Sequence, residues 1–98
     1  IGPSYFVNLT ECLIKIAKAE GLDKEMAEKL SMETFIGAAS LAEKYKTMSS
    51  EEHRINVTSP GGTTEAALNE LMSQNALQDL MYKAVKSAVA RGNALSGK

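Results

Sequence analysis

Residues 76–95 read ALQDLMYKAVKSAVARGNAL and carry the clearest structural pattern in the chain. Their apolar side chains recur every three or four residues, which is the spacing of one face of an α-helix. This stripe consists of Leu77, Leu80, Met81, Ala84, Val85, Ala88 and Val89. Because the stripe is unbroken, the segment predicts a long helix that buries one face against another helix.

The same spacing recurs upstream, where start and stop residues delimit two more helices. Pro3 suits a first turn, because the missing N–H costs nothing there, and Gly21 suits the left-handed end of a helix over residues 3–20. Asp23 is a good N-cap, and it predicts a second helix over residues 24–46.

Two shorter helices complete the pattern. Ser49 and Glu52 have the spacing of a capping box and predict a helix over residues 50–56. A fourth helix is predicted over residues 64–73, and Asn75 is predicted to cap the last one. No strand-like alternation is present, so the predicted fold class is all-α, with about five helices.

Small residues interrupt the second predicted helix at its middle, at Gly37, Ala38 and Ala39. A glycine inside a helix costs about 1 kcal/mol relative to alanine. Small side chains allow another backbone to approach, so this triplet predicts a tight helix–helix crossing.

Composition narrows the class of protein. The 98 residues fit a single domain over residues 1–98, and 44% apolar and 23% charged residues are typical of a folded globular protein. A net charge of −1 offers no basic surface for nucleic acid. No apolar run approaches the roughly 18 residues of a membrane span. The apolar stripes are wide for so small a chain, which predicts an interlocked helical dimer rather than a free monomer.

Cysteine and histidine each occur once, which argues against a disulfide, a catalytic histidine and a metal site. Cys12 is the only cysteine, so no internal disulfide can form; this favours a reducing, cytoplasmic location, and the thiol is expected to be buried in helix packing. His53 is the only histidine and has neither a partner nucleophile nor enough companion ligands for a metal site. We therefore interpret His53 as a solvated helix residue and expect no metal.

The only extended non-helical stretch is residues 57–64, VTSPGGTT. Its two glycines allow a ligand close to the backbone, its hydroxyls can donate or accept, and the free N–H groups of a following helix favour an anion. It lacks the lysine of a Walker loop and the spacing of a dinucleotide fingerprint, so a small carboxylate is the better guess. A Ser-Pro turn followed by a threonine N-cap explains the local pattern equally well.

Residues 57–64 resemble the signature of pyrroline-5-carboxylate reductases, and further similarities follow along the chain. Gly2-Pro3 and Tyr5 resemble the Gly-Pro-Ala-Tyr start of that family's first helix, with Ser4 in place of alanine. The second helix resembles the family's Thr-x-x-Gly-Ala-Ala-x-Leu stretch. The other matching positions are Glu11, Leu13, Gly21, Leu22, Val85, Ala88 and Arg91.

The resemblance implies a function. Such enzymes reduce the imine of 1-pyrroline-5-carboxylate to proline with NADPH or NADH, which binds mainly to an N-terminal Rossmann domain that is absent from this chain. The helical domain, similar to the C-terminal domain of 6-phosphogluconate dehydrogenase, would form homodimers and higher homo-oligomers. The isolated domain is expected to be inactive.

The resemblance also implies roles for individual residues. Ser59, Thr63 and Thr64 would hold the substrate carboxylate, and Gly61 and Gly62 would permit its close approach. Val57 would lie against the substrate ring. The Thr64 hydroxyl would also lie near the imine nitrogen, which makes it the candidate catalytic group; Thr64 and water both remain open as proton source. The alternative function is a non-catalytic helical dimerisation module related to the reductase.

Overall fold

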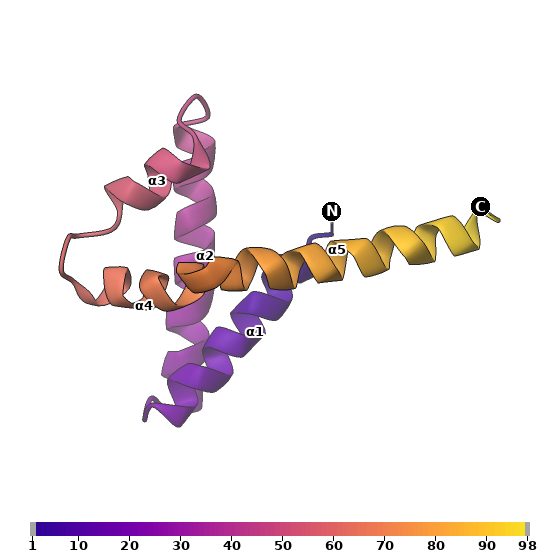
Figure 1. Cartoon of the computed structure of the whole chain (residues 1–98). Helices are drawn as coiled ribbons and strands as arrows, with labels where there is room; N and C mark the ends of the chain where they lie inside the picture. Colours follow the sequence, from indigo (N-terminus) through magenta and orange to yellow (C-terminus); the bar gives the residue numbers. More distant parts are fainter. Residues whose placement is uncertain (1, 98) are drawn as a thin grey trace. The chain divides into compact units, whose positions relative to one another are not determined.

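A computed structural model describes residues 2–97 of the chain, and this part contains five α-helices and one 3₁₀ turn. In chain order these are α1 (Ser4–Ala19), α2 (Lys24–Lys44), α3 (Ser50–Asn56), α4 (Thr63–Met72), η1 (Ser73–Asn75) and α5 (Ala76–Leu95). Since no loop separates α4, η1 and α5, the helices form four helical segments, and the last of these is bent at η1 (Figure 1). No strand occurs between residues 2 and 97, so the predicted all-α class is confirmed.

The predicted helix boundaries lie within two residues of the observed ones. The bounds of α3 and α5 agree with the prediction, and α2 ends at Lys44, two residues before the predicted end. The start of α4 is the exception that matters for function. It begins at Thr63 rather than at residue 64, so Gly62, and not a threonine, occupies the N-cap position.

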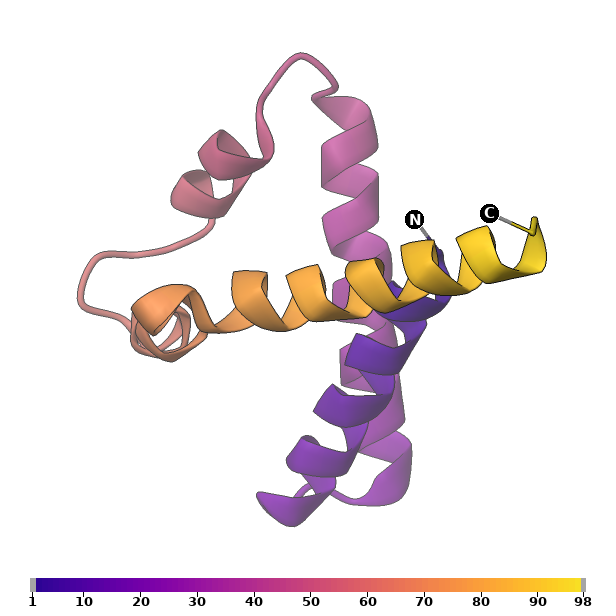
Figure 2. The ribbon, with the colours of Figure 1, turned by 45° about the vertical axis from the view of Figure 1, so that its right-hand side comes forward.

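The chain divides into two compact units between His53 and Arg54. In the first unit, α1 and α2 lie side by side and run in opposite directions (Figures 1 and 2). The rings of Phe6 and Phe35 stack between the two helices, with centroids 6.5 Å apart and an interplanar angle of 11°. Offset stacking of this kind adds to the apolar area that the two helices bury.

The predicted start and stop residues of this unit are confirmed. Gly21 has φ of 109°, and the N–H of Leu22 donates to the carbonyl of Ala17 over 3.1 Å, which closes α1 in a Schellman-type end. The Asp23 carboxylate accepts a hydrogen bond from the backbone N–H of Met26 over 2.9 Å, so that Asp23 caps α2.

Little of the first unit is buried, although α1 and α2 are in contact. Ala27 and Thr10 are its only buried residues in the described part of the chain. A groove of about 350 Å³ between the two helices is lined by Leu13, Ile16, Ala17, Leu30, Ser31 and Thr34. Large apolar side chains such as Ile36, 56% exposed, therefore remain in contact with solvent.

One expectation for this unit is wrong within the described residues. Cys12 is exposed and not buried, because its face of α1 is not covered. A Cβ atom placed on Gly37 would find no atom of the first unit within 4 Å, so α1 does not cross α2 closely at this residue, and the tight crossing expected there stays a prediction.

In the second unit the helical path turns sharply between α4 and α5, as Figure 2 shows. The turn lies at Gln74 and Asn75, which both adopt left-handed backbone angles, with φ of 52° and 57°. Asn75 occupies the predicted N-cap position of α5, but its side chain makes no capping hydrogen bond. That part of the prediction is wrong, because a left-handed Asn75 serves the turn rather than the cap.

The apolar stripe of α5 remains largely uncovered. Leu80 is 63% exposed and Val89 is 52% exposed, although α5 contacts α4 and η1 within its unit. A stripe of this length is normally buried. No helix between residues 2 and 97 has the length and apolar character required for a membrane span.

Candidate functional site

The candidate site follows α3 and is shaped first by the way that α3 ends. The Thr58 hydroxyl donates to the carbonyl of Arg54 over 2.6 Å, and the Thr58 N–H donates to the carbonyl of Ile55 over 3.2 Å. Both bonds use carbonyl groups that the last turn of a helix leaves without partners. The hydroxyl and the N–H of Thr58 are therefore both bonded to the end of α3. These bonds set the direction in which the chain enters the site.

A tight turn over Ser59–Gly62 comes next. The N–H of Gly62 donates to the carbonyl of Ser59 over 3.1 Å, and Gly61 has φ of 74°. Proline in the second position and a left-handed glycine in the third are typical of a type II turn. The Pro-Gly pair therefore creates the bend between α3 and α4, with Gly61 providing the conformation that other residues rarely adopt.

Helix α4 begins immediately after this turn, with several N–H groups unused. Gly62 is extended at the N-cap, with φ of −91° and ψ of −177°, and has no side chain to cap the helix. The first bond of the helix runs from the N–H of Ala66 to the carbonyl of Gly62 over 3.2 Å. The N–H groups of Thr63 and Thr64 precede this bond and have no recorded acceptor within residues 2–97. Together with the helix dipole, they favour a bound anion.

A cleft of about 250 Å³ lies at this helix start and is lined by Val57, Ser59, Gly62, Thr63 and Thr64. Five of the six residues predicted to bind substrate therefore meet around one opening. Gly61 is the sixth and does not line the cleft. The space is of the right order for a small organic acid, and Val57 provides one apolar wall beside the hydroxyl groups of Ser59 and the two threonines.

Gly62 is constrained by its neighbours as well as by the cleft. A Cβ atom on Gly62 would lie 3.3 Å from the carbonyl oxygen of Ser59 and 3.6 Å from the Ser59 Cβ. A side chain there would press on the turn and would also enter the opening. Glycine at this position keeps both the turn and the helix start accessible.

Glu65 was not singled out from the sequence, yet it contacts the turn directly. Its Oε1 accepts a hydrogen bond from the Gly61 N–H over 3.1 Å, and the side chain is half-buried. Glu65 does not line the cleft at the helix start, but lines a neighbouring one together with Arg54, Thr58 and Pro60. The available signal was its spacing, since a glutamate three residues after an N-cap is typical of a capping box.

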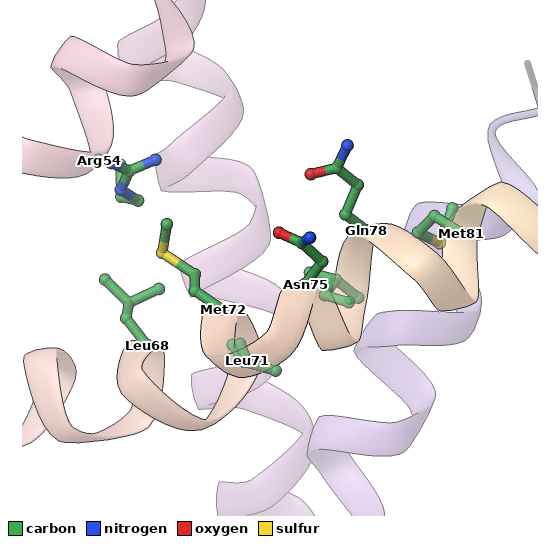
Figure 3. A pocket seen from close by; sticks show the side chains of 8 residues that line it. Arg54, Leu68, Leu71, Met72, Asn75, Gln78 and Met81 are labelled. Atoms are coloured by element: carbon green, nitrogen blue, oxygen red, sulfur yellow. The ribbon is translucent and has the colours of Figure 1, made fainter.

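A larger groove of about 410 Å³ lies in the second unit, where Arg54 of α3 faces residues of α4, η1 and α5 (Figure 3). Its lining is mostly apolar and includes Leu68, Met72 and Met81, with Arg54 at one end and the amide groups of Asn75 and Gln78 along it. The lining brings together no nucleophile and acid–base pair, and no group of possible metal ligands is found among residues 2–97. We assign this groove no chemistry.

The sequence predicts that His53 is a solvated helix residue. In the structure His53 also makes a contact with the end of α2. Its Nε2 lies 3.3 Å from the carbonyl oxygen of Tyr45, and the two rings lie 6.4 Å apart at a tilt of 52°. Tyr45 follows the last residue of α2, where carbonyl groups lack helical partners. His53 thereby ties the start of α3 to the end of α2.

Replacement of Gly61 by alanine is expected to lower the free energy of unfolding by about 1 kcal/mol, because alanine is strained at a φ of 74°. Gly61→Asn is the matched control, since asparagine tolerates left-handed angles better and should lose less. Urea unfolding of both variants measures the difference. Equal stability of the alanine variant and the unmodified protein would contradict the left-handed turn.

Comparison with known proteins identifies the family. Residues 1–95 match the family model described as pyrroline-5-carboxylate reductase dimerisation. The chain belongs to this family. Among its relatives, the pyrroline-5-carboxylate reductase of Vibrio alginolyticus is 39% identical over 89 residues, which cover 91% of this chain and 32% of that protein. Pyrroline-5-carboxylate reductase 1 of Bacillus subtilis (strain 168) is 34% identical over 99 residues, covering 97% of this chain and 31% of the relative.

A third relative has a similar identity and coverage. The pyrroline-5-carboxylate reductase of Pseudomonas aeruginosa is 35% identical over 95 residues, covering 97% of this chain and 34% of that protein. The chain thus spans about a third of the length of the reductases that it matches. No significant match to a solved structure was found.

Proposed function

We propose that this chain is the helical, substrate-binding and dimerising part of a pyrroline-5-carboxylate reductase, which reduces 1-pyrroline-5-carboxylate to proline. The observation that carries the proposal is the cleft at the start of α4, where Val57, Ser59, Gly62, Thr63 and Thr64 surround unpartnered N–H groups. This arrangement suits a small carboxylate, and it occurs in a chain that belongs to the reductase family.

In the proposed complex the substrate carboxylate accepts hydrogen bonds from the N–H groups and hydroxyls of Thr63 and Thr64, and from the Ser59 hydroxyl. The positive end of the α4 dipole offsets its charge. Val57 packs against the apolar part of the ring. Because the carboxylate and the ring are both held, the imine carbon is presented in one orientation, which lowers the entropy cost of the reaction.

The nicotinamide of NADPH or NADH, when bound, supplies the hydride. The described residues contain no strand and no glycine-rich strand–helix turn, so we place the nucleotide mainly on a Rossmann domain outside this chain. Protonation of the imine nitrogen makes the carbon a better hydride acceptor. The Thr64 hydroxyl and a water molecule in the cleft are the two candidate proton sources.

The dimer is proposed on the exposed stripe of α5 and on the open face of α2 at Gly37. Each large apolar side chain that a partner covers contributes roughly 1.5–3 kcal/mol. A second copy of this chain would bring the same stripes, which agrees with the dimerisation family that the chain matches. Higher homo-oligomers and a cytoplasmic location stay predictions, as does the single domain over residues 1–98.

The second candidate is a non-catalytic dimerisation module, which is favoured by the description of the matched family. The two functions differ in one assay. The full-length protein that contains this chain should oxidise NADPH or NADH only when 1-pyrroline-5-carboxylate is present, and proline should be the product. Folded, dimeric protein without this activity, and with no affinity for proline, would favour the module.

A further inference from the structure

The hydrogen bond between Glu65 and the turn before α4 points to a function for a residue that has no role in the proposed chemistry. Glu65 lies in the first turn of α4, and its Oε1 accepts from the Gly61 N–H over 3.1 Å. The bond spans the Ser59–Gly62 turn and the helix start, which are the two segments that form the cleft. It is the only recorded side-chain bond that joins them within the described part of the chain.

We propose that Glu65 is a positioning residue of the carboxylate site, and this inference rests on the proposed function. The turn has few other restraints. Its internal bond, from the Gly62 N–H to the Ser59 carbonyl, closes the turn but does not fix its angle to the helix. Gly61 and Gly62 also make this backbone unusually free to rotate. The Glu65 carboxylate restricts that rotation from the helix side.

The side on which Glu65 lies strengthens the inference. Glu65 lines the neighbouring cleft with Arg54 and Pro60, and it does not line the opening formed by Thr63 and Thr64. A carboxylate inside that opening would repel an anionic substrate and would compete for the free N–H groups. By bonding to the N–H of Gly61, a residue that does not line the cleft, Glu65 leaves the N–H groups of Thr63 and Thr64 for the substrate.

The test compares three variants of the full-length protein by steady-state kinetics. Glu65→Ala removes the bond and should raise KM for the imine substrate about three- to tenfold, the value of one ordinary hydrogen bond, with kcat nearly unchanged. Glu65→Gln keeps an oxygen acceptor and should restore KM to within about twofold. Glu70→Ala is the matched control, because Glu70 is an exposed residue of the same helix with no recorded bond, and it should behave like the unmodified protein.

A second measurement reports the bond without activity. Hydrogen–deuterium exchange of a peptide covering the turn, in the substrate-free protein, should be faster in Glu65→Ala and unchanged in Glu65→Gln. Unchanged KM and unchanged exchange in Glu65→Ala would overturn the inference, as would equal loss of affinity in the alanine and glutamine variants. Thr64→Val distinguishes failure of this inference from failure of the proposed function. If Thr64→Val weakens substrate binding and Glu65→Ala does not, the carboxylate site stands and only the role of Glu65 fails.

Discussion

Replacement of Thr64 by valine in the full-length protein is expected to lower kcat/KM for the imine substrate by about ten- to a hundredfold. Valine keeps the shape of threonine but removes the hydroxyl that lines the cleft at the start of α4. One hydrogen bond to a charged group is worth roughly 1.5–3 kcal/mol, which corresponds to one to two decades in affinity or rate. The backbone N–H of residue 64 remains, so binding should be weakened rather than abolished.

The division of this loss between KM and kcat identifies the role of the hydroxyl. A rise in KM alone indicates a contact to the carboxylate that is equally strong in the ground state and the transition state, whereas a fall in kcat indicates a contribution to protonation of the imine. Thr34→Val is the matched control, because its hydroxyl already donates to the carbonyl of Leu30 within α2 over 2.7 Å. Normal kinetics in the Thr64 variant would remove this residue from the site.

The second large effect is expected at the α5 stripe, where Leu80→Glu should weaken self-association by about thirty- to a thousandfold. Leu80 is 63% exposed in the single chain and lies on the stripe that a second copy is proposed to cover. Truncation of a central interface residue commonly costs about 2–4 kcal/mol, and a buried charge without a partner adds to this. Sedimentation or light scattering across a concentration series measures the shift from dimer to monomer.

Ala90→Glu is the matched control for this prediction. Ala90 lies on α5 two to three turns after Leu80, but helical spacing puts it on the opposite, charged side with Lys83 and Lys86. The same new charge at residue 90 should leave the dimer intact. Equal dissociation by both variants, or by neither, would show that the stripe does not form the contact.

The local features of this chain follow from short-range physics and were predictable. The caps at Asp23 and Ser49, the left-handed glycine at Gly21 and the periodic stripe of α5 each depend on residues within one or two helical turns. For this reason the all-α class and most helix bounds agree with the structure. Residues 57–64 were also recognisable as a candidate anion site, since the glycines and the hydroxyl-bearing residues follow one another directly and a helix comes next.

Features that depend on a neighbour in space were not predictable from the pattern. Cys12 was expected to be buried, but it is exposed. Helical spacing shows which residues share a face, but it does not show what packs against that face. Asn75 was expected to cap α5, but the sharp turn after α4 required its backbone to be left-handed instead. In each case the outcome was decided by the position of another segment.

The sequence by itself therefore determined the helices, the Pro-Gly turn and the group of residues at the start of α4, because hydrogen-bonding capacity, backbone freedom and periodicity are properties of consecutive residues. Only the tertiary structure decided that Gly61 does not line the cleft while Glu65 binds its N–H, and that the stripe of α5 stays largely open within its own unit. These outcomes depend on the direction in which one segment leaves another, and the dihedral angles of a few hinge residues set that direction.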